Sequence, residues 1–399
     1  MSNTIFLVVK KELTDIFRDK RTLIMSILIP LLLFPILSMV IGRSINSANK
    51  SVEENLKIAV VDKGNSSLQK FLKEQKNINV VSTSAPEEDV KEGRIFVAVI
   101  IAPDFDAAIE KGDTAPVTLV YDNSSQQSGL AMSKINVLIG NYSKGIVTER
   151  LAAKNIDVKI LSPIEIKEQT SQKEGDGTAK MILSMMLPLL LIVYCVTGPL
   201  PAATDLGAGE KERGTLEPLL TTRANRMSLL WGKFLAITVM GLITSVASLA
   251  GMYIAMSQKN GMFTSGSPQG TTGSISLEPQ ALIVIGVVVV LTTMVFGALE
   301  LSISIYARSF KEAQTYLSPL TIIAIIPIYA TYMLDAKNIS TAYFNIPLAN
   351  EVCVLKEVIS GIYNPVHILI TVAWTAAYIA ASIVFARYMF NRERVVFRT

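Results

Sequence analysis

Long runs without charge alternate along this chain with short segments rich in charged residues. A helix needs about 20 apolar residues to cross about 30 Å of hydrocarbon. Six windows meet that length: 22–42, 181–204, 234–258, 279–299, 313–334 and 358–386. The pattern predicts an α-helical membrane protein with six transmembrane helices. The first run exceeds the apolar stretch of about 7–15 residues in a secretory signal, which favours a retained span.

The segment before the first span has a helical pattern of its own. Within 3–20, four apolar residues recur at helical spacing, with charges opposite: Ile5, Val9, Leu13 and Ile16. Such a helix can lie along the membrane surface. We therefore expect residues 1–21 to form an interfacial amphipathic helix and 22–42 to form span 1. A plain cytoplasmic flanking helix is the alternative.

Residues 43–180 separate spans one and two and have a different pattern. Short runs rich in Val and Ile predict strands at 56–61, 94–101, 115–121 and 158–166. Helices are expected between them, at 66–76 with Ser66 or Ser67 as its cap, and at about 124–154. Strands that alternate with helices indicate a small α/β domain.

Residues 181–399 hold spans 2 to 6. Between the last two spans, the segment 335–365 mixes apolar and charged residues. This mixture predicts a short helix or a re-entrant hairpin at the outer surface.

The charge distribution orients the spans. Half of the residues are hydrophobic and 18% are charged, against about 25% charged in soluble domains. With the N-terminus inside, the inner segments hold 16 Lys and Arg residues and the short outer loops hold three. Positive residues favour the cytoplasmic side, so both termini are expected there and domain 43–180 outside. The net charge of +4 reflects this topology and does not indicate nucleic-acid binding.

The chain lacks the residues that most enzymes need. It has no G-x-x-x-x-G-K-[ST] phosphate loop, one histidine and two cysteines. Nucleotide hydrolysis by that loop, a zinc site and a serine–histidine relay are therefore not expected. We predict a protein with no catalytic residue, no metal site and no cofactor of its own.

The inner loop between spans two and three has an unusual composition. GEKERGTLEPLLTTR, residues 209–223, contains six charged residues, two glycines and one proline. Gly214 permits a tight turn, Thr215 can cap a helix, and Glu217 suits the helix N-terminus. This construction predicts a coupling helix within about 206–228, with a helical run from Leu216 and a break at TTRANR, that docks onto a soluble partner. A solvated loop without a partner is the alternative.

These motifs are similar to those of a known family. The stretch G-E-K-E-R-G-T-L-E, with the later Gly232-Lys233, resembles the coupling element of type-2 ABC exporter permeases. KKELTDIFRDKRTL, residues 10–23, resembles the interfacial helix and first-span entry of that family. The placement of the outer domain and the segment 298–320 resemble the NatB-type sodium-export permeases.

The resemblance implies partners, a location and a cargo. It implies a separate cytoplasmic ABC ATPase that holds ATP and Mg, and a second permease copy, identical or different. It also implies a bacterial cytoplasmic membrane and sodium ions as cargo. The residues that would couple the chain to the ATPase are Gly209, Glu210, Lys211, Glu212, Arg213, Gly214, Thr215 and Glu217.

Two carboxylates near or within the spans are candidates for an ion path. Glu300 lies in a long apolar run, eight residues before Arg308 and so about 12 Å deeper. With nearby hydroxyls such as Ser302 and Ser304 it could bind a hard cation, or it could pair with an arginine and only orient helices. Asp205 is the second candidate, with a role at the inner boundary as its alternative.

Three functions remain open from the sequence. An ATP-driven sodium exporter follows from the resemblance. An exporter of a peptide, an antibiotic or a lipid-like substrate is the second possibility. A membrane-anchored receptor or scaffold with an outer binding domain is the third.

Overall fold

The structure is a computed structural model that describes residues 2–161, 163–164, 176–222, 224–259, 261–263 and 278–392. The chain divides into two compact units. One unit comprises Met1–Val40 and Gln172–Thr399, and the other comprises Ile41–Ser171.

The membrane unit confirms the six predicted spans. Helices long and apolar enough to cross a bilayer are α2 (Lys20–Glu54), the segment Lys180–Glu212, α11 (Arg226–Met256), α12 (Pro279–Tyr306), α13 (Phe310–Ala330) and α15 (Pro365–Asn391). Two boundaries differ from the prediction. Helix α2 continues past residue 42 to Glu54. Helix α15 begins at Pro365 rather than at 358, because Gly361 (φ 80°) turns the chain before it.

The second span is a series of short elements. It consists of α7 (Asp176–Thr197), α8 (Leu200–Thr204), a π-helix (Asp205–Gly209) and α9 (Glu210–Glu212). Gly198 and Pro199 separate α7 from α8, where proline interrupts the helical hydrogen bonds. The π-helix brings Gly207 against α12, where a Cβ would lie 2.3 Å from the Ser304 Oγ. Such wide turns are rare and often mark functional sites.

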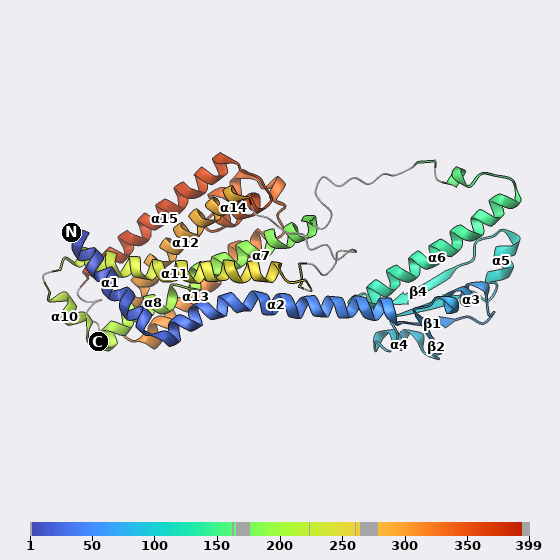
Figure 1. Cartoon of the computed structure of the whole chain (residues 1–399), viewed down its shortest axis with the longest axis horizontal. Helices are drawn as coiled ribbons and strands as arrows, with labels where there is room; N and C mark the ends of the chain where they lie inside the picture. Colours follow the sequence, from blue (N-terminus) through green and yellow to red (C-terminus); the bar gives the residue numbers. More distant parts are fainter. Residues whose placement is uncertain are drawn as a thin grey trace. The chain divides into compact units, whose positions relative to one another are not determined.

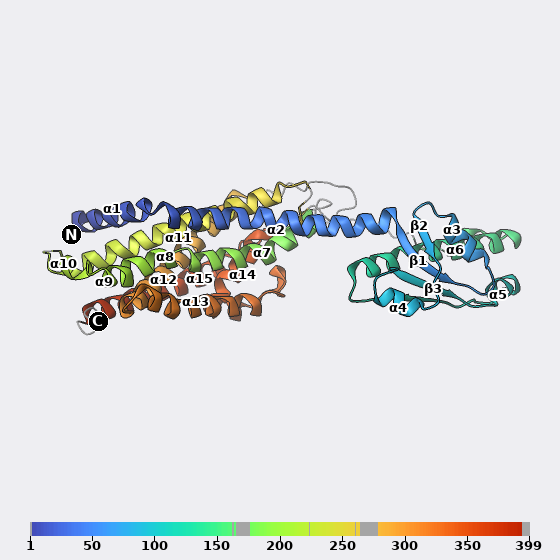
Figure 2. The same ribbon diagram turned by 90° about the horizontal axis from the view of Figure 1, so that it is seen from below.

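Helix α1 (Ser2–Arg18) packs along α11. The contact is so close that a Cβ on Gly232 would lie 2.3 Å from the Val8 Cγ1. The predicted apolar face of α1, including Leu13 and Ile16, is half-buried. Helix α1, α10 (Leu216–Leu220) and the C-terminal end of α15 lie at the same end of the bundle (Figures 1 and 2).

A short helix is enclosed by the spans. Helix α14 (Ala349–Ile359) packs against α7, α12, α13 and α15, and all eleven of its residues are buried. Two 3₁₀ helices, Ala336–Asn338 and Thr341–Asn345, precede it. The segment 335–365 therefore forms the expected short helix, but inside the bundle rather than on its surface.

The second unit is the predicted α/β region between spans one and two. Its sheet has the order β2-β1-β3-β4. The strands are β1 (Leu56–Val61), β2 (Ile78–Val81), β3 (Val97–Ile101) and β4 (Val117–Tyr121). Strand β1 pairs in parallel with β2 and β3, whereas β3 and β4 are antiparallel.

Helices complete this unit: α3 (Ser67–Glu74), α4 (Pro86–Lys91), α5 (Phe105–Lys111) and α6 (Gln126–Ala153). The Ser66 side chain accepts a hydrogen bond from the Gln69 backbone N–H at 3.3 Å, so the predicted cap is confirmed. Apolar residues of β1, β3, α3 and α6, among them Ile58, Leu72 and Ile135, form the core.

The expected strand at 158–166 is wrong. Val158–Leu161 is a 3₁₀ helix whose residues are all exposed, while residues 165–166 lie outside the described part. It follows a turn in which Asn155 has a φ of 55°. The strand that the pattern missed is β2, which has only four residues.

Candidate coupling and ion-path sites

The charged stretch after the second span forms a helix end, a turn and a short helix. After α9 the chain turns at Gly214, whose φ of 69° lies in the left-handed region that favours glycine. Thr215 closes the turn, because its N–H (2.9 Å) and its hydroxyl (3.2 Å) both donate to the Glu210 carbonyl. Helix α10 follows, and α11 starts at Arg226. Within the segment 206–228, α10 begins at Leu216, where the helical run is expected, and it is separate from α11. The Glu217 side chain lies outside the described part.

Four charged side chains meet beneath this stretch. The Lys233 ammonium lies 2.6 Å from the Glu210 Oε2 and 3.4 Å from the Glu12 Oε1, and it also donates to the Leu206 carbonyl at 3.0 Å. The Lys11 ammonium lies 3.1 Å from a carboxylate oxygen of both Glu12 and Glu210. Lys11, Glu12, Glu210 and Lys233 are named here the inner charge cluster. They join α1, α9 and α11.

The inner charge cluster is buried and balanced. Glu12 and Lys233 are 0% exposed and Glu210 is 4% exposed. Removing such ions from water costs several kcal/mol each unless opposite charges compensate. Two cations and two anions meet that condition here. Burial opposes the charge on half-exposed Lys11, but the carboxylates of Glu210 and Glu12 outweigh it and raise the pKa of that side chain.

Two other charged residues of this stretch, Lys211 and Glu212, form hydrogen bonds with further helices. Lys211 donates to the carbonyls of Ile305 (2.7 Å) and Ala307 (3.1 Å) at the end of α12. Glu212 accepts from the Phe310 N–H (2.7 Å) at the start of α13. Residues 210–212 therefore attach the segment to α1, α11, α12 and α13.

The Arg213 side chain contacts the second span, which it follows in the chain. It pairs with Asp205 of the π-helix at 2.7 Å, and both side chains are about half-exposed. This pair places the ion-path candidate Asp205 at the end of the second span. Gly209 lies one turn further along, where a Cβ would be 2.7 Å from the Asp205 Oδ1.

The predicted coupling residues differ in exposure. Glu212, Arg213, Gly214 and Thr215 are exposed and can meet a partner. Glu210 is inside. Lys11, Glu12 and Lys233 lie in the segments that carry the family resemblance, but the sequence did not predict that they pair with Glu210. A signal existed, since Glu12 interrupts the apolar face of α1 and Lys233 is the single charge between Arg226 and residue 258.

Glu300 has no such compensation. It is 0% exposed in α12, and neither carboxylate oxygen has a hydrogen-bond partner within the described residues. The Arg308 N–H donates to Glu312 at 2.8 Å, and no described ion pair joins Arg308 to Glu300. The Ser302 hydroxyl donates to its own helix, and that of Ser304 donates to the Thr204 carbonyl. A buried carboxylate without partners is unfavourable, and in a membrane span it marks a functional candidate.

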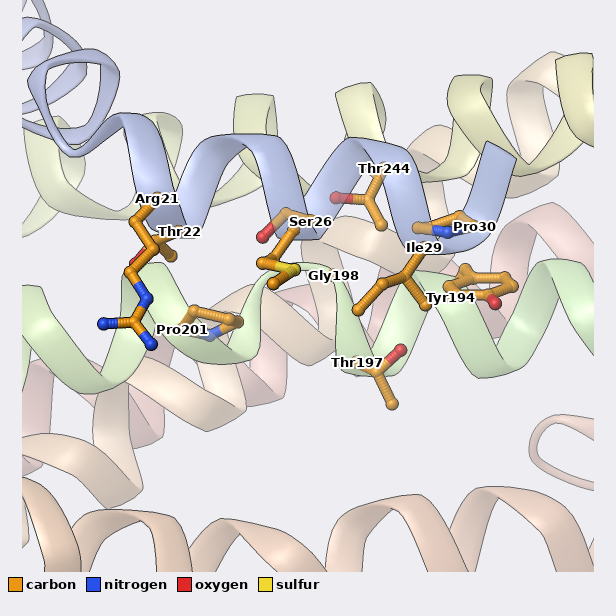
Figure 3. A pocket seen from close by; sticks show the side chains of 11 residues that line it. Arg21, Thr22, Ser26, Ile29, Pro30, Tyr194, Thr197, Gly198, Pro201 and Thr244 are labelled. Atoms are coloured by element: carbon orange, nitrogen blue, oxygen red, sulfur yellow. The ribbon is translucent and has the colours of Figure 1, made fainter. Parts of the chain in front are cut away.

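A groove lies between α2 and the second span. It has a volume of about 370 Å³. Figure 3 shows its lining side chains between the two helices, with Arg21 at one end and Tyr194 at the other. Hydroxyl groups of Thr22, Ser26 and Thr197 alternate with apolar side chains such as Ile29. The groove therefore suits a molecule that is apolar along most of its length and anionic at one end.

Comparisons with known proteins assign the family. The family described as ABC-2 family transporter protein matches residues 20–388. The ABC transporter permease protein NatB of Bacillus subtilis (strain 168) is 30% identical over 390 residues, which are 97% of this chain and 98% of that protein. Permeases of this family are the non-catalytic membrane component of a transporter and carry no cofactor themselves. The chain belongs to the ABC-2 transporter family, as a multi-pass membrane permease that works with an ATPase partner.

Proposed function

We propose that this permease is half of an ATP-driven exporter that extrudes sodium ions. A separate cytoplasmic ABC ATPase docks on the segment from α9 to α10, and a second permease copy completes the transporter. ATP and Mg belong to the ATPase. The observation that carries the proposal is the attachment of residues 210–212 to α1, α11, α12 and α13.

The contacts support a mechanical role for this segment. A force on the exposed turn at Arg213 and Gly214 reaches four helices through short contacts, of which the one between Glu210 and Lys233 is buried. Packed helices respond to such a force by moving between discrete arrangements. The break at Gly198 and the π-helix Asp205–Gly209 supply two positions at which the second span can bend.

The orientation is part of the proposal. Helices α1 and α10 and the C-terminal end of α15 lie at one end of the bundle (Figure 1). Lysine and arginine are concentrated in the segments at that end. The positive-inside rule makes it the cytoplasmic end, with both termini inside and the α/β unit outside.

Sodium as cargo is supported by the resemblance and by Glu300. Carboxylate oxygens are preferred ligands of hard cations. The Glu300 carboxylate is the buried one that lacks both a counter-charge and hydrogen bonds within the described chain. Inverted membrane vesicles that contain the permease and its ATPase should accumulate sodium on addition of ATP. ATP hydrolysis without sodium uptake would reject this cargo.

The docking part is tested separately by charge reversal. Arg213→Glu changes an exposed residue of the turn and should weaken capture of the ATPase by the purified permease. Lys70→Glu, at an exposed lysine of α3 in the α/β unit, is the matched control. Equal capture by both variants would contradict docking at this turn.

The groove between α2 and the second span favours a second candidate, a lipid-like substrate. Its apolar lining with Arg21 at one end suits an anionic amphiphile. ATP-dependent movement of a labelled anionic lipid, lost in Arg21→Gln while sodium uptake stays at background, would favour this candidate over sodium.

A further inference from the structure

Helices α14 and α15 face each other with polar side chains in the middle of an apolar bundle. On α15, His367, Thr371 and Thr375 are buried and recur every four residues, so they lie on one face about 6 Å apart. On α14, Glu357 and Glu351 contact the two ends of this row. The His367 Nδ1 lies 2.8 Å from the Glu357 Oε1, and the Thr375 hydroxyl donates to the Glu351 Oε1 at 3.3 Å.

A hydroxyl of α12 extends the row. Thr292 donates to the Glu351 Oε2 at 2.7 Å. Glu351, Glu357, His367, Thr371, Thr375 and Thr292 are named here the polar column. All six are at most 9% exposed.

Two oxygens of the polar column have no hydrogen-bond partner within the described chain. They are the Glu357 Oε2 and the Thr371 Oγ1. Thr371 lies between His367 and Thr375 on α15, so its hydroxyl belongs to the same row. Buried polar atoms are normally hydrogen-bonded, and an unpaired one calls for an explanation such as an ion.

The nearby lysine does not neutralise the column. The Lys356 ammonium donates to the carbonyls of Thr331 (2.6 Å), Tyr332 (2.7 Å) and Leu334 (3.2 Å), at the end of α13. Among the described ion pairs, His367 contacts the Glu357 carboxylate, and none joins a cationic side chain to Glu351. The polar column therefore has two acidic groups and an excess of oxygen ligands.

We propose that the polar column binds a sodium ion at the level of Thr371. The unpaired oxygens of Thr371 and Glu357 are ligands, and Glu351 supplies further negative charge. Carboxylate and hydroxyl oxygens suit a hard cation and not a soft one. This assignment rests on the proposed function, sodium export, and adds a second ion-binding position to the proposed path. Thr292 and Glu300 are eight residues apart on α12, which places the column about 12 Å from Glu300 along that helix.

Sodium binding by the purified full-length chain tests the proposal. Binding of radioactive sodium is measured in nanodiscs, together with the melting temperature in sodium chloride and in choline chloride at equal ionic strength. Thr371→Val keeps the shape of the side chain and removes a hydroxyl that has no described partner, so the fold should be kept. We expect it to weaken sodium binding about tenfold or more. Glu351→Gln should weaken binding as well.

Thr238→Val is the matched control. Thr238 is a buried threonine of α11 whose hydroxyl bonds to its own helix at the Phe234 carbonyl, so its loss should leave sodium binding unchanged. Wild-type sodium affinity in both Thr371→Val and Glu351→Gln would overturn the proposal. Stabilisation by calcium or potassium in place of sodium would overturn the identity of the ion.

Transport separates this site from the proposed function. If wild type and both variants show equal ATP-driven sodium uptake and equal sodium binding, the polar column is rejected as a sodium site. Sodium export is then still supported. If the variants weaken sodium binding but the wild type shows no sodium uptake, the site is supported and sodium export is rejected.

Discussion

The inner charge cluster and Glu300 show two opposite ways to bury charge in one bundle. In the cluster, Lys233 contacts two carboxylates and Lys11 completes a balanced set. Glu300 is equally buried, but neither of its oxygens has a described partner. The free energy of burial is compensated in the first case and uncompensated in the second.

We propose that this difference separates residues that transmit force from residues on the transport path. A balanced cluster holds α1, α9 and α11 in one arrangement, because its carboxylates already have cationic partners. A lone carboxylate stabilises nothing by itself, so it is available for a cation or a proton. The predictions below test this division, in order of their expected effect on stability.

Lys233→Met should produce the largest loss of stability. It leaves the buried carboxylates of Glu12 and Glu210 with only half-exposed Lys11 as counter-charge. Breaking a buried ion pair in this way costs about 3–5 kcal/mol. Thermal unfolding in detergent measures it, with Lys337→Met, at an exposed lysine, as control. Adding Glu12→Gln and Glu210→Gln to Lys233→Met should restore much of the loss. No restoration would show that Lys233 acts by packing rather than by charge.

Gly232→Ala should have the next largest effect. The added Cβ would lie 2.3 Å from the Val8 Cγ1 and 2.5 Å from its Cβ, so α1 must move away from α11. Overpacking of this kind costs about 1–3 kcal/mol. Gly286→Ala on α12 is the control, because nothing lies within 4 Å of its added Cβ. Equal melting temperatures for the two variants would contradict a tight contact between α1 and α11.

The sequence predicted the elements that depend on composition. Charge-free runs identified all six spans, and runs of Val and Ile located β1, β3 and β4. The errors have physical causes. Strand β2 is too short to give a pattern. Residues 158–161 include β-branched side chains, but they pair with no strand among the residues that the structure describes.

The site was less predictable, because pairing across helices leaves no trace in spacing. Glu210 was predicted as a coupling residue, but its burial depends on Lys233 and Lys11, which are 23 and 199 residues away. Glu300 was singled out as a candidate because a charge within a span is informative by itself. Glu351 was not found, since the composition of α14 gave no sign that spans enclose it.

Lys11→Met should have a small effect. The Lys11 side chain is 49% exposed, so solvent screens its ion pairs with Glu210 and Glu12. Exposed or half-exposed pairs contribute about 0–1 kcal/mol. A thermal shift as large as that of Lys233→Met would show that Lys11 belongs to the buried part of the cluster, and the division between its two lysines would be wrong.

Glu300→Gln should have the smallest effect on stability and a large effect on transport. No described ion pair or hydrogen bond is lost, and an amide is no more costly to bury than a carboxylate. We expect an unfolding free energy within about 1 kcal/mol of wild type, with ATP-driven sodium uptake abolished. The same change at Glu210 is the matched comparison. It removes the partner of Lys233 and should destabilise by about 3 kcal/mol. If the two variants lost equal stability, Glu300 would have a partner like that of Glu210, and its separate role in transport would lose its basis.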